Sequence, residues 1–228
     1  MTQTPAAELN TRREVFLHPV EVERWKSAGV PRRQDEFLRG RYAAKLALGA
    51  WKPEVPAKAW HVAAGVFGQP VVRDGNDGNG NAGNPLVSIT HSGAWAAALA
   101  VDEGHPMAVD LECDDPAHAE ILRREISTEE WSALARAGVP AERCPTVSWA
   151  IREALAKVLR TGLMAPRSFY EIAEVESIPG EPGVRGSYRH FAQYGVQAYW
   201  LREFALAVAL PQKPALALGN CFTTINLR

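Results

Sequence analysis

The chain has 228 residues, of which 46% are hydrophobic and 22% charged, and its formal net charge is −1. This length allows a sizeable core in one large domain or two small lobes, and the near-neutral charge disfavours a general nucleic-acid binder. Cys113, Cys144 and Cys221 lack Cys-x-x-Cys spacing, which favours free thiols over disulfides or a zinc site. The start lacks a signal-peptide pattern and no apolar run approaches ~20 residues, so we expect a cytoplasmic protein without a membrane span.

The hydrophobic pattern predicts helices and strands in clusters, which favours an α+β fold over a strictly alternating one. Residues 1–30 are poorly periodic and predict no regular element. The predicted elements are a helix over 31–49, strands over 66–72, 88–90, 96–101 and 107–112, helices over 117–124, 128–137 and 148–159, and strands over 169–176, 187–191, 196–201 and 204–210 that close an antiparallel sheet.

Residues 74–85 form a Gly/Asn-rich stretch that predicts a linker without a packed core. The spacing Asp77-x-Asn79-x-Asn81 resembles the start of an EF-hand calcium loop. However, Ala82 stands where that loop needs glycine, and Ser88 stands where it needs glutamate. A mobile insertion is therefore favoured over a calcium site.

Two acidic residues alternate within the predicted strand over 107–112. Asp110 and Glu112 are two residues apart, so both carboxylates leave the same face of a strand. Met107, Val109 and Leu111 leave the opposite face. An exposed strand edge with solvated carboxylates is the ordinary alternative. Two carboxylates in one shared space are unfavourable without a cation, which favours a metal site.

The predicted helix over 148–159 adds a third carboxylate and an ammonium group. Glu153 and Lys157 are four residues apart and lie on one face of a helix. A weak ion pair on a solvated helix face is the alternative. Three oxygen ligands beside a fixed cation are what a divalent metal bound to a phosphate ester requires. Asp110, Glu112 and Glu153 therefore predict a site for phosphoryl-group chemistry.

Four segments carry a family resemblance: residues 37–45, 88–92, 108–112 and 149–157. In this order they resemble the motifs of 4'-phosphopantetheinyl transferases of the large, monomeric type that activates surfactin and enterobactin synthetases. The resemblance implies two similar α+β lobes related by a pseudo-twofold axis. We expect these lobes at residues 1–103 and 104–228, with the metal ligands in the second.

The resemblance implies an enzyme that transfers 4'-phosphopantetheine from coenzyme A to a serine of an acyl or peptidyl carrier protein and releases adenosine 3',5'-bisphosphate. Mg²⁺ would be held by Asp110, Glu112 and Glu153, and Lys157 would add fixed positive charge, so that Glu153 and Lys157 are expected to be catalytic. Glu130 matches the family's candidate general base, with Glu129 as its neighbouring alternative and a solvated helix carboxylate as the ordinary reading.

The same resemblance implies the contacts to coenzyme A. Thr90 and His91 match a segment whose histidine lies against the phosphorylated ribose, and Arg32 matches a basic residue near the 3'-phosphate. Arg152 and Lys157 would contact phosphate oxygens. Arg152 replaces a lysine of the family motif, so a planar fork replaces a point charge. Gln69 likewise stands where the surfactin-type branch has lysine.

Two other functions compete with this interpretation. A catalytically inactive protein of the same fold could still bind coenzyme A or a carrier protein, but retention of three carboxylates and Lys157 argues against lost turnover. An unrelated metal-dependent phosphatase or nucleotidase would not need the segments at 37–45 and 88–92. The sequence does not identify the carrier protein.

The sequence contains two further, weaker patterns. Residues 42–48 match residues 149–155 in their aromatic, small, basic and apolar positions, with Leu46 at the place of Glu153, which indicates an internal repeat. Residues 118–124 combine two apolar side chains with Arg123 and Arg124. This segment predicts either a docking surface for an acidic carrier protein or an ordinary amphipathic helix.

Overall fold

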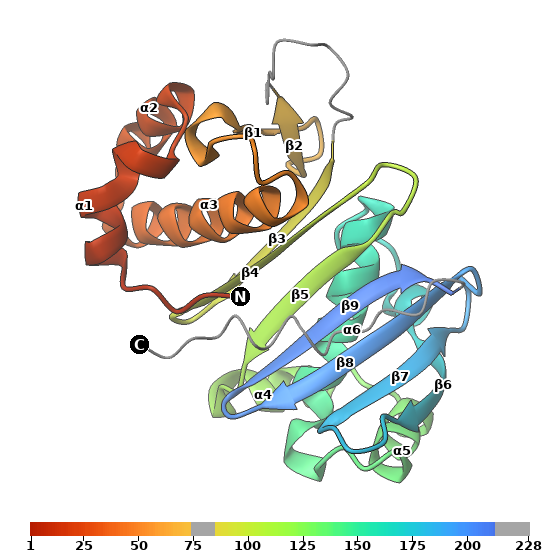
Figure 1. Ribbon diagram of the computed structural model, residues 1–228. Coiled ribbons are helices and arrows are strands. Elements are labelled where there is room, and N and C mark those ends of the chain that lie inside the picture. Colours follow the sequence, from red (N-terminus) through yellow and green to blue (C-terminus); the bar gives the residue numbers. More distant parts are fainter. Residues whose placement is uncertain (74–84, 213–228) are drawn as a thin grey trace. The chain divides into compact units, whose positions relative to one another are not determined.

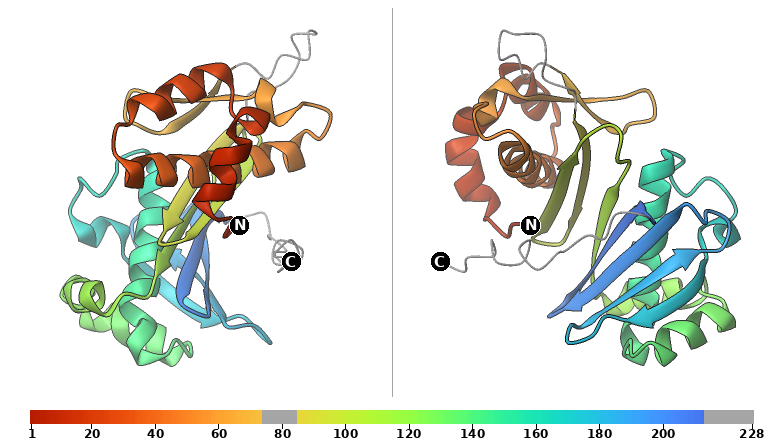
Figure 2. Two further views of the ribbon diagram at one scale, coloured as in Figure 1. Left: turned by 90° about the vertical axis from the view of Figure 1, so that its left-hand side faces the viewer. Right: turned by 45° about the vertical axis from the view of Figure 1, so that its right-hand side comes forward.

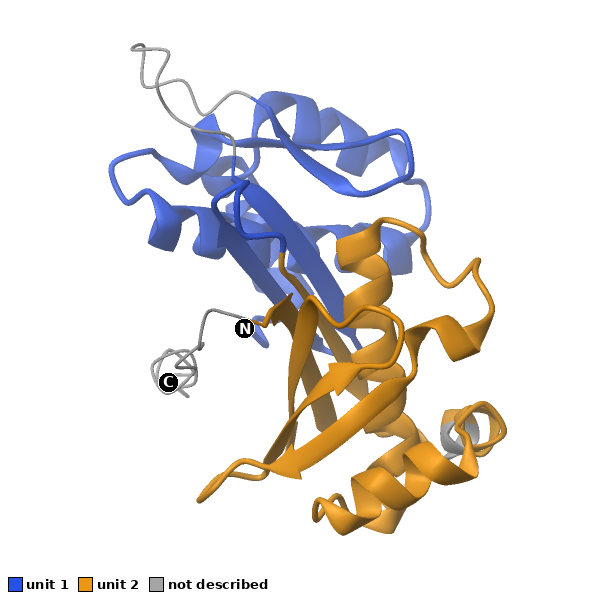
Figure 3. Ribbon diagram, turned by 90° about the vertical axis from the view of Figure 1, so that its right-hand side faces the viewer, with its two compact units in different colours: residues 1–106, 216–228 blue, residues 107–215 orange. Residues whose placement is uncertain are grey.

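The computed structural model describes residues 1–73 and 85–212 and contains both helices and antiparallel sheet, which confirms the α+β fold (Figure 1). The described chain forms two compact units, unit 1 and unit 2, divided between Pro106 and Met107 (Figure 3). The expected lobe boundary at 103/104 and the pseudo-twofold axis stay predictions. The linker at 74–84 and Cys221 lie outside the described residues. Among the described helices, none has the length and apolar character needed to cross a membrane.

Unit 1 begins with three helices, of which the sequence pattern predicted the third. They are α1 (Ala6–Phe16), α2 (Pro19–Ser27) and α3 (Pro31–Trp51). Helix α2 starts with an unusual cap, because Nδ1 of His18 accepts a hydrogen bond from Val20 N while the Glu21 carboxylate accepts one from His18 N, at 3.3 and 2.9 Å. Histidine is not among the preferred cap residues, so Pro19 at the first helical position and Glu21 at the third were not recognised as a helix start.

The strands of unit 1 form two antiparallel pairs. Strand β1 (His61–Ala64) pairs with β2 (Pro70–Arg73), and β3 (Leu86–Ser92) pairs with β4 (Trp95–Val101). The predicted single strand over 66–72 is therefore wrong at its start. Val66 and Phe67 lie at the tip of the β1–β2 hairpin and are 94% and 78% exposed, so their apolar character did not mark a buried strand.

Helix α3 packs along β3 and β4 (Figure 2). A Cβ atom on Gly40 would lie only 3.2 Å from Cγ2 of Ile89, so glycine allows the helix to approach the strand closely. The core beneath α3 contains buried apolar residues from the helix, both strand pairs and the connection before β1: Ala44, Leu48, Val55, Trp60, Val62, Val72 and Val87.

A buried carboxylate ties α2, α3 and β1 together. Glu21 is 1% exposed, and its carboxylate lies 2.8 Å from the Lys45 ammonium and 3.4 Å from Arg41 Nε. It also accepts a hydrogen bond from Val62 N at 2.9 Å, while Lys45 donates to the carbonyl oxygen of Trp60. Burial lowers the pKa of Lys45, and the charge of Glu21 opposes that shift.

Unit 2 is a five-stranded antiparallel sheet with helices inserted after its first strand. The spatial order of the strands is β5-β9-β8-β7-β6, so the first and last strands of the unit are neighbours. The elements of unit 2 are β5 (Ala108–Cys113), α4 (Pro116–Arg123), α5 (Thr128–Arg136), α6 (Cys144–Leu159), β6 (Ile172–Ser177), β7 (Gly183–Tyr188), β8 (Tyr194–Leu201) and β9 (Phe204–Pro211). The described residues also include three short 3₁₀ helices, one in unit 1 at Ala57–Ala59 and two in unit 2 at Ala141–Arg143 and Arg167–Tyr170.

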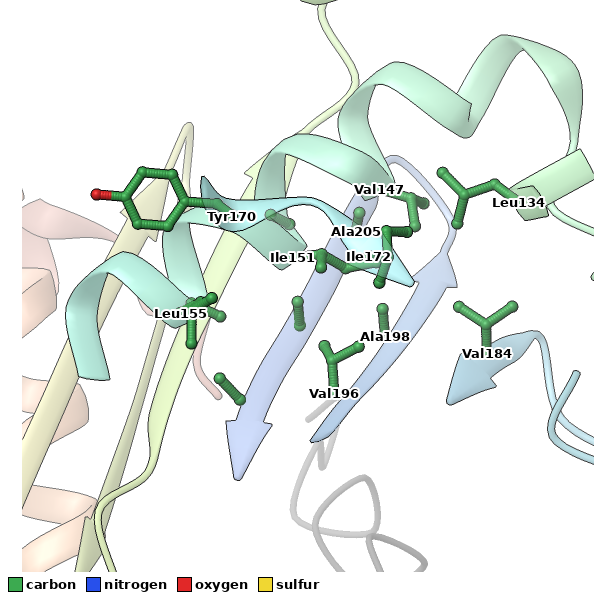
Figure 4. Packing of buried hydrophobic residues seen from close by; sticks show 14 of the residues in the cluster. Leu134, Val147, Ile151, Leu155, Tyr170, Ile172, Val184, Val196, Ala198 and Ala205 are labelled. Carbon is green, nitrogen blue, oxygen red and sulfur yellow. The ribbon is translucent and has the colours of Figure 1, made fainter. Parts of the chain in front are cut away.

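Helix α6 packs against β5, β9 and β8 on one face of this sheet. Small residues face it from β9, namely Ala205, Ala207 and Ala209, and from the helix itself Ala150 and Ala154 enter the same core. Small side chains on both surfaces allow a close approach of helix and strand. Among the residues labelled in Figure 4 are eight larger members of this core: Leu134, Val147, Ile151, Leu155, Tyr170, Ile172, Val184 and Val196.

The Glu21 network generates a prediction about stability. Replacing Glu21 with alanine leaves Lys45 buried without its partner, and we expect the free energy of unfolding to fall by about 3–5 kcal/mol. Glu23 is the matched control in the same helix, because its ion pair with Lys26 is exposed and its loss should cost at most about 1 kcal/mol. Urea denaturation followed by circular dichroism measures both. Equal losses in the two variants would contradict the structural role of Glu21.

Candidate functional site

The register of β5 with β9 sets the direction of the two acidic side chains. Asp110 lies opposite Ala207 and Glu112 opposite Ala205. Directly opposed residues of antiparallel strands share a face, so both carboxylates lie on the face that α6 covers. Val109 and Leu111 lie on the other face, as the alternation in the sequence predicted. The small alanines opposite the acids leave space above β9 for the helix.

Helix α6 brings the third carboxylate and the ammonium to the same place. Asp110, Glu112 and Glu153 each offer an oxygen atom within 4.8 Å of the others. The Lys157 ammonium lies 2.6 Å from Oδ1 of Asp110 and 3.4 Å from the carbonyl oxygen of Val109. Asp110 is buried, whereas the other three side chains are half-buried. The structure therefore gathers the three carboxylates and the ammonium group that the sequence predicted to lie together on β5 and α6.

The site carries an excess of negative charge. Burial raises the pKa of the Glu153 carboxyl, the charge of Asp110 raises it further, and the Lys157 ammonium opposes both effects. Three ionised carboxylates and one ammonium leave two net negative charges. One divalent cation would offset this charge, and carboxylate oxygens are the ligands that Mg²⁺ prefers. The residues present thus fit a divalent metal.

Arg152 lies away from this cluster, although it precedes Glu153 in the sequence. Its side chain is 2% exposed and forms an ion pair with Glu130, which is 3% exposed. Its second terminal nitrogen donates to the carbonyl oxygen of Glu125 at 2.9 Å. The structure therefore brings Arg152 and Glu130 together, and it does not bring Arg152 beside Lys157. Glu129 lies exposed on the first turn of α5.

The carboxylate of Glu130 is held inside unit 2. One oxygen pairs with Arg152, and the other accepts a hydrogen bond from Ile172 N at 3.5 Å. Burial raises the pKa of Glu130, and the charge and hydrogen bond of Arg152 oppose that rise. The sequence gave no sign of this pairing, because the two residues are far apart in the chain.

The predicted coenzyme A residues lie in unit 1. His91 is exposed near the end of β3 and lines a cavity of about 260 Å³, whereas Thr90 is buried and points to the opposite face of the strand. Arg32 is 87% exposed at the start of α3, where its Nε lies 2.9 Å from Oε1 of Glu36. Glu36 lines the cavity and Arg32 does not.

Two arginine side chains that line this cavity were not predicted from the sequence. Arg24 of α2 and Arg41 of α3 line it together with Phe37, and the Arg41 guanidinium lies 4.7 Å from the centre of the Phe37 ring. Arg41 belongs to the segment 37–45 whose family resemblance was noted, so a signal was present. Arg24 lies among residues 1–30, where the pattern predicted no helix, and only the fold brings it to the cavity.

The fold and site of unit 2 define a class of protein. Two carboxylates on a sheet strand, with a third carboxylate and a lysine on the covering helix, form the donor set of proteins that hold a divalent cation beside a phosphate group. Residues 106–209 match the family model of the 4'-phosphopantetheinyl transferase superfamily, and the chain therefore carries a domain of this transferase superfamily. The comparison with curated proteins gave no match.

The carboxylate cluster generates a prediction about metal binding. Asp110→Asn removes one charge and one hard oxygen ligand, so we expect the affinity for Mn²⁺ to fall at least tenfold relative to the unaltered protein. Electron paramagnetic resonance of free Mn²⁺ measures the affinity without any substrate. Glu181→Gln, an exposed change between β6 and β7, is the matched control and should bind Mn²⁺ like the parent. Equal affinities for Asp110→Asn and the parent would refute the metal site.

Proposed function

We propose that the protein transfers 4'-phosphopantetheine from coenzyme A to a serine of an acyl or peptidyl carrier protein and releases adenosine 3',5'-bisphosphate. One observation carries the proposal: the three carboxylates converge beside Lys157 within a domain of the 4'-phosphopantetheinyl transferase superfamily. Transferases of this superfamily are generally dependent on a divalent metal. The cluster supports Mg²⁺ as the cofactor.

The residues of the chain have distinct roles in this reaction. Asp110, Glu112 and Glu153 would hold Mg²⁺, which when bound offsets negative charge on the pyrophosphate of coenzyme A. Lys157 supplies a fixed positive charge to the same phosphate. Its ion pair with Asp110 restricts the ammonium, so little reorganisation is needed as charge develops on the leaving phosphate.

The cavity of unit 1 supports the binding of coenzyme A. Arg24, Arg41 and His91 present nitrogen donors to a space of about 260 Å³ beside the ring of Phe37. Cationic donors suit a phosphate, and an aromatic ring and an arginine suit a planar base. Arg32, exposed and next to Glu36, could contribute from the edge of this cavity, whereas Thr90 would act from the other face of β3.

The carrier serine must lose its proton as its oxygen attacks the phosphorus atom. The family resemblance favoured Glu130 as the acceptor of this proton, with the neighbouring Glu129 as the alternative. Both oxygens of Glu130 already accept hydrogen bonds in the core of unit 2.

Helix α4 supports a contact to an acidic carrier protein. Ile121 is 58% exposed, so this side chain does not pack inward. Arg124 is exposed and pairs only loosely with Glu120, at 3.5 Å, while the Arg123 guanidinium lies 5.0 Å from the centre of the Trp131 ring. An exposed apolar residue bordered by arginines matches a partner with acidic and apolar side chains on one helix.

The mass of a carrier protein tests the proposed function directly. An apo carrier protein incubated with this protein, coenzyme A and Mg²⁺ should gain one phosphopantetheine group, because the serine oxygen replaces the leaving nucleotide on phosphorus. Chelation of the metal, or Asp110→Asn, should abolish the gain. An unchanged carrier with intact coenzyme A would favour a binding protein without turnover, and hydrolysed coenzyme A would favour a phosphatase.

The arginines near the end of α4 generate a prediction about the carrier protein. Reversing Arg123 and Arg124 to glutamate should raise the KM for the carrier at least fivefold and leave the KM for coenzyme A unchanged. The effect should shrink at high salt, because the Debye length falls from about 10 Å at 0.1 M to about 3 Å at 1 M. Arg136→Glu with Arg185→Glu is the control, since it changes the net charge equally at exposed positions elsewhere. Equal effects of the two double variants would exclude docking on α4.

A further inference from the structure

The buried ion pair of Arg152 and Glu130 connects four segments of unit 2. Arg152 lies on α6, and Glu130 lies at the third position of α5, after the cap residue Ser127. The carboxylate also accepts a hydrogen bond from the first residue of β6, Ile172, and the guanidinium donates to the carbonyl oxygen of Glu125 before α5. The pair therefore fixes α6 against its neighbours.

Unit 1 contains the same arrangement in the same order along the chain. Lys45 lies on the long helix α3 and pairs with Glu21, which is the third residue of α2 after its cap. Glu21 accepts a hydrogen bond from Val62 N on the strand that follows, and Lys45 donates to the carbonyl oxygen of Trp60. All four charged side chains are at most 3% exposed.

The internal repeat in the sequence aligns these two cations. When residues 42–48 are laid over residues 149–155, Lys45 falls on Arg152, and Leu46 falls on Glu153. Leu46 is 48% exposed and cannot bind a metal. Unit 1 thus contains the buried ion pair although it has no carboxylate at the position of Glu153. The pair therefore has a structural role in each unit and does not take part in the reaction.

On α6 the structural residue Arg152 directly precedes Glu153, the candidate metal ligand. Successive residues of an α-helix are separated by about 100° around its axis. With Arg152 held by Glu130, the next residue, Glu153, is turned toward Asp110 and Glu112, and Lys157 follows one turn later on the same face. Rotation of α6 about its axis would break the buried pair.

We propose that Glu130 is a positioning residue, which acts through Arg152 to hold Glu153 and Lys157 against the strand carboxylates, and that it does not accept the proton of the carrier serine. The statement that Glu130 does not accept the serine proton rests on the proposed function. The statement that Glu130 positions Glu153 and Lys157 concerns the metal site alone and is tested without a carrier protein.

A rescue experiment separates positioning from proton transfer. Glu130→Leu should weaken Mn²⁺ binding at least tenfold and lower turnover, because Arg152 is left buried without its carboxylate partner. Glu130→Leu with Arg152→Met replaces the whole pair by apolar side chains, which buried ion pairs often tolerate. This double variant should regain Mn²⁺ affinity to within threefold and turnover to within tenfold of the parent.

The matched control is an exposed pair in the same unit. Glu176 and Arg185 lie 2.6 Å apart on β6 and β7, and both side chains are more than half exposed. Glu176→Leu with Arg185→Met should leave Mn²⁺ affinity and turnover unchanged. A change in Mn²⁺ affinity in this control equal to that of Glu130→Leu would overturn the inference.

Two further results would also overturn it. One is a Glu130→Leu/Arg152→Met variant that regains Mn²⁺ affinity while its turnover stays at least a hundredfold low, since a general base supplies about 10²–10⁴-fold. The other is Glu130→Leu with unchanged Mn²⁺ affinity. If circular dichroism shows that these variants do not fold, Glu130→Gln is the deciding variant, because its amide oxygen can still accept a hydrogen bond from Arg152. Turnover within tenfold of the parent supports the positioning role. A loss of turnover above a hundredfold with intact Mn²⁺ binding refutes it.

Failure of the proposed function would give a different result. In that case the parent protein would attach no phosphopantetheine to a carrier. Mn²⁺ affinity of Glu130→Leu and of the double variant would still show whether the pair positions α6.

Discussion

The close packing of helix α6 on the sheet of unit 2 is the constraint on which the site depends. Asp110 and Glu112 lie on the covered face because β5 pairs with β9 in a register that sets them opposite Ala207 and Ala205. Larger residues at these alanines would hold the helix away from β5. The three carboxylates would then be too far apart to share one cation. Apolar packing thus brings together charges that repel each other.

Burial of this charge has an energetic cost that the structure offsets only in part. Asp110 gains the ammonium of Lys157, whereas Glu153 has a raised pKa because it is partly buried beside Asp110. A site with two excess negative charges is stabilised by a divalent cation far more than a neutral site would be. A divalent cation would therefore offset the charge that the packing of α6 brings together.

The two buried glutamate–cation pairs indicate how each unit fixes its long helix. A buried ion pair contributes little net stability compared with apolar side chains of similar size, but it penalises any arrangement that separates its partners. Glu21 with Lys45 and Glu130 with Arg152 each join a helix start, a long helix and a strand. Such pairs select one rotation of the helix, and in unit 2 that rotation directs Glu153 toward Asp110 and Glu112.

The sequence by itself determined the α+β class, most strands of unit 2 and the set of acidic residues on β5 and α6, because these follow from local periodicity of two or about 3.6 residues. It missed α1 and α2, whose starts lack the usual cap residues. It also missed β1 and began β2 too early, at the exposed apolar tip of Val66 and Phe67. Only the tertiary structure decided that Arg152 pairs with Glu130, and that His91, but not Thr90, lines the cavity beside Phe37. Adjacent residues on a helix or strand point in different directions, and the sequence does not say which direction is covered until distant segments pack against it.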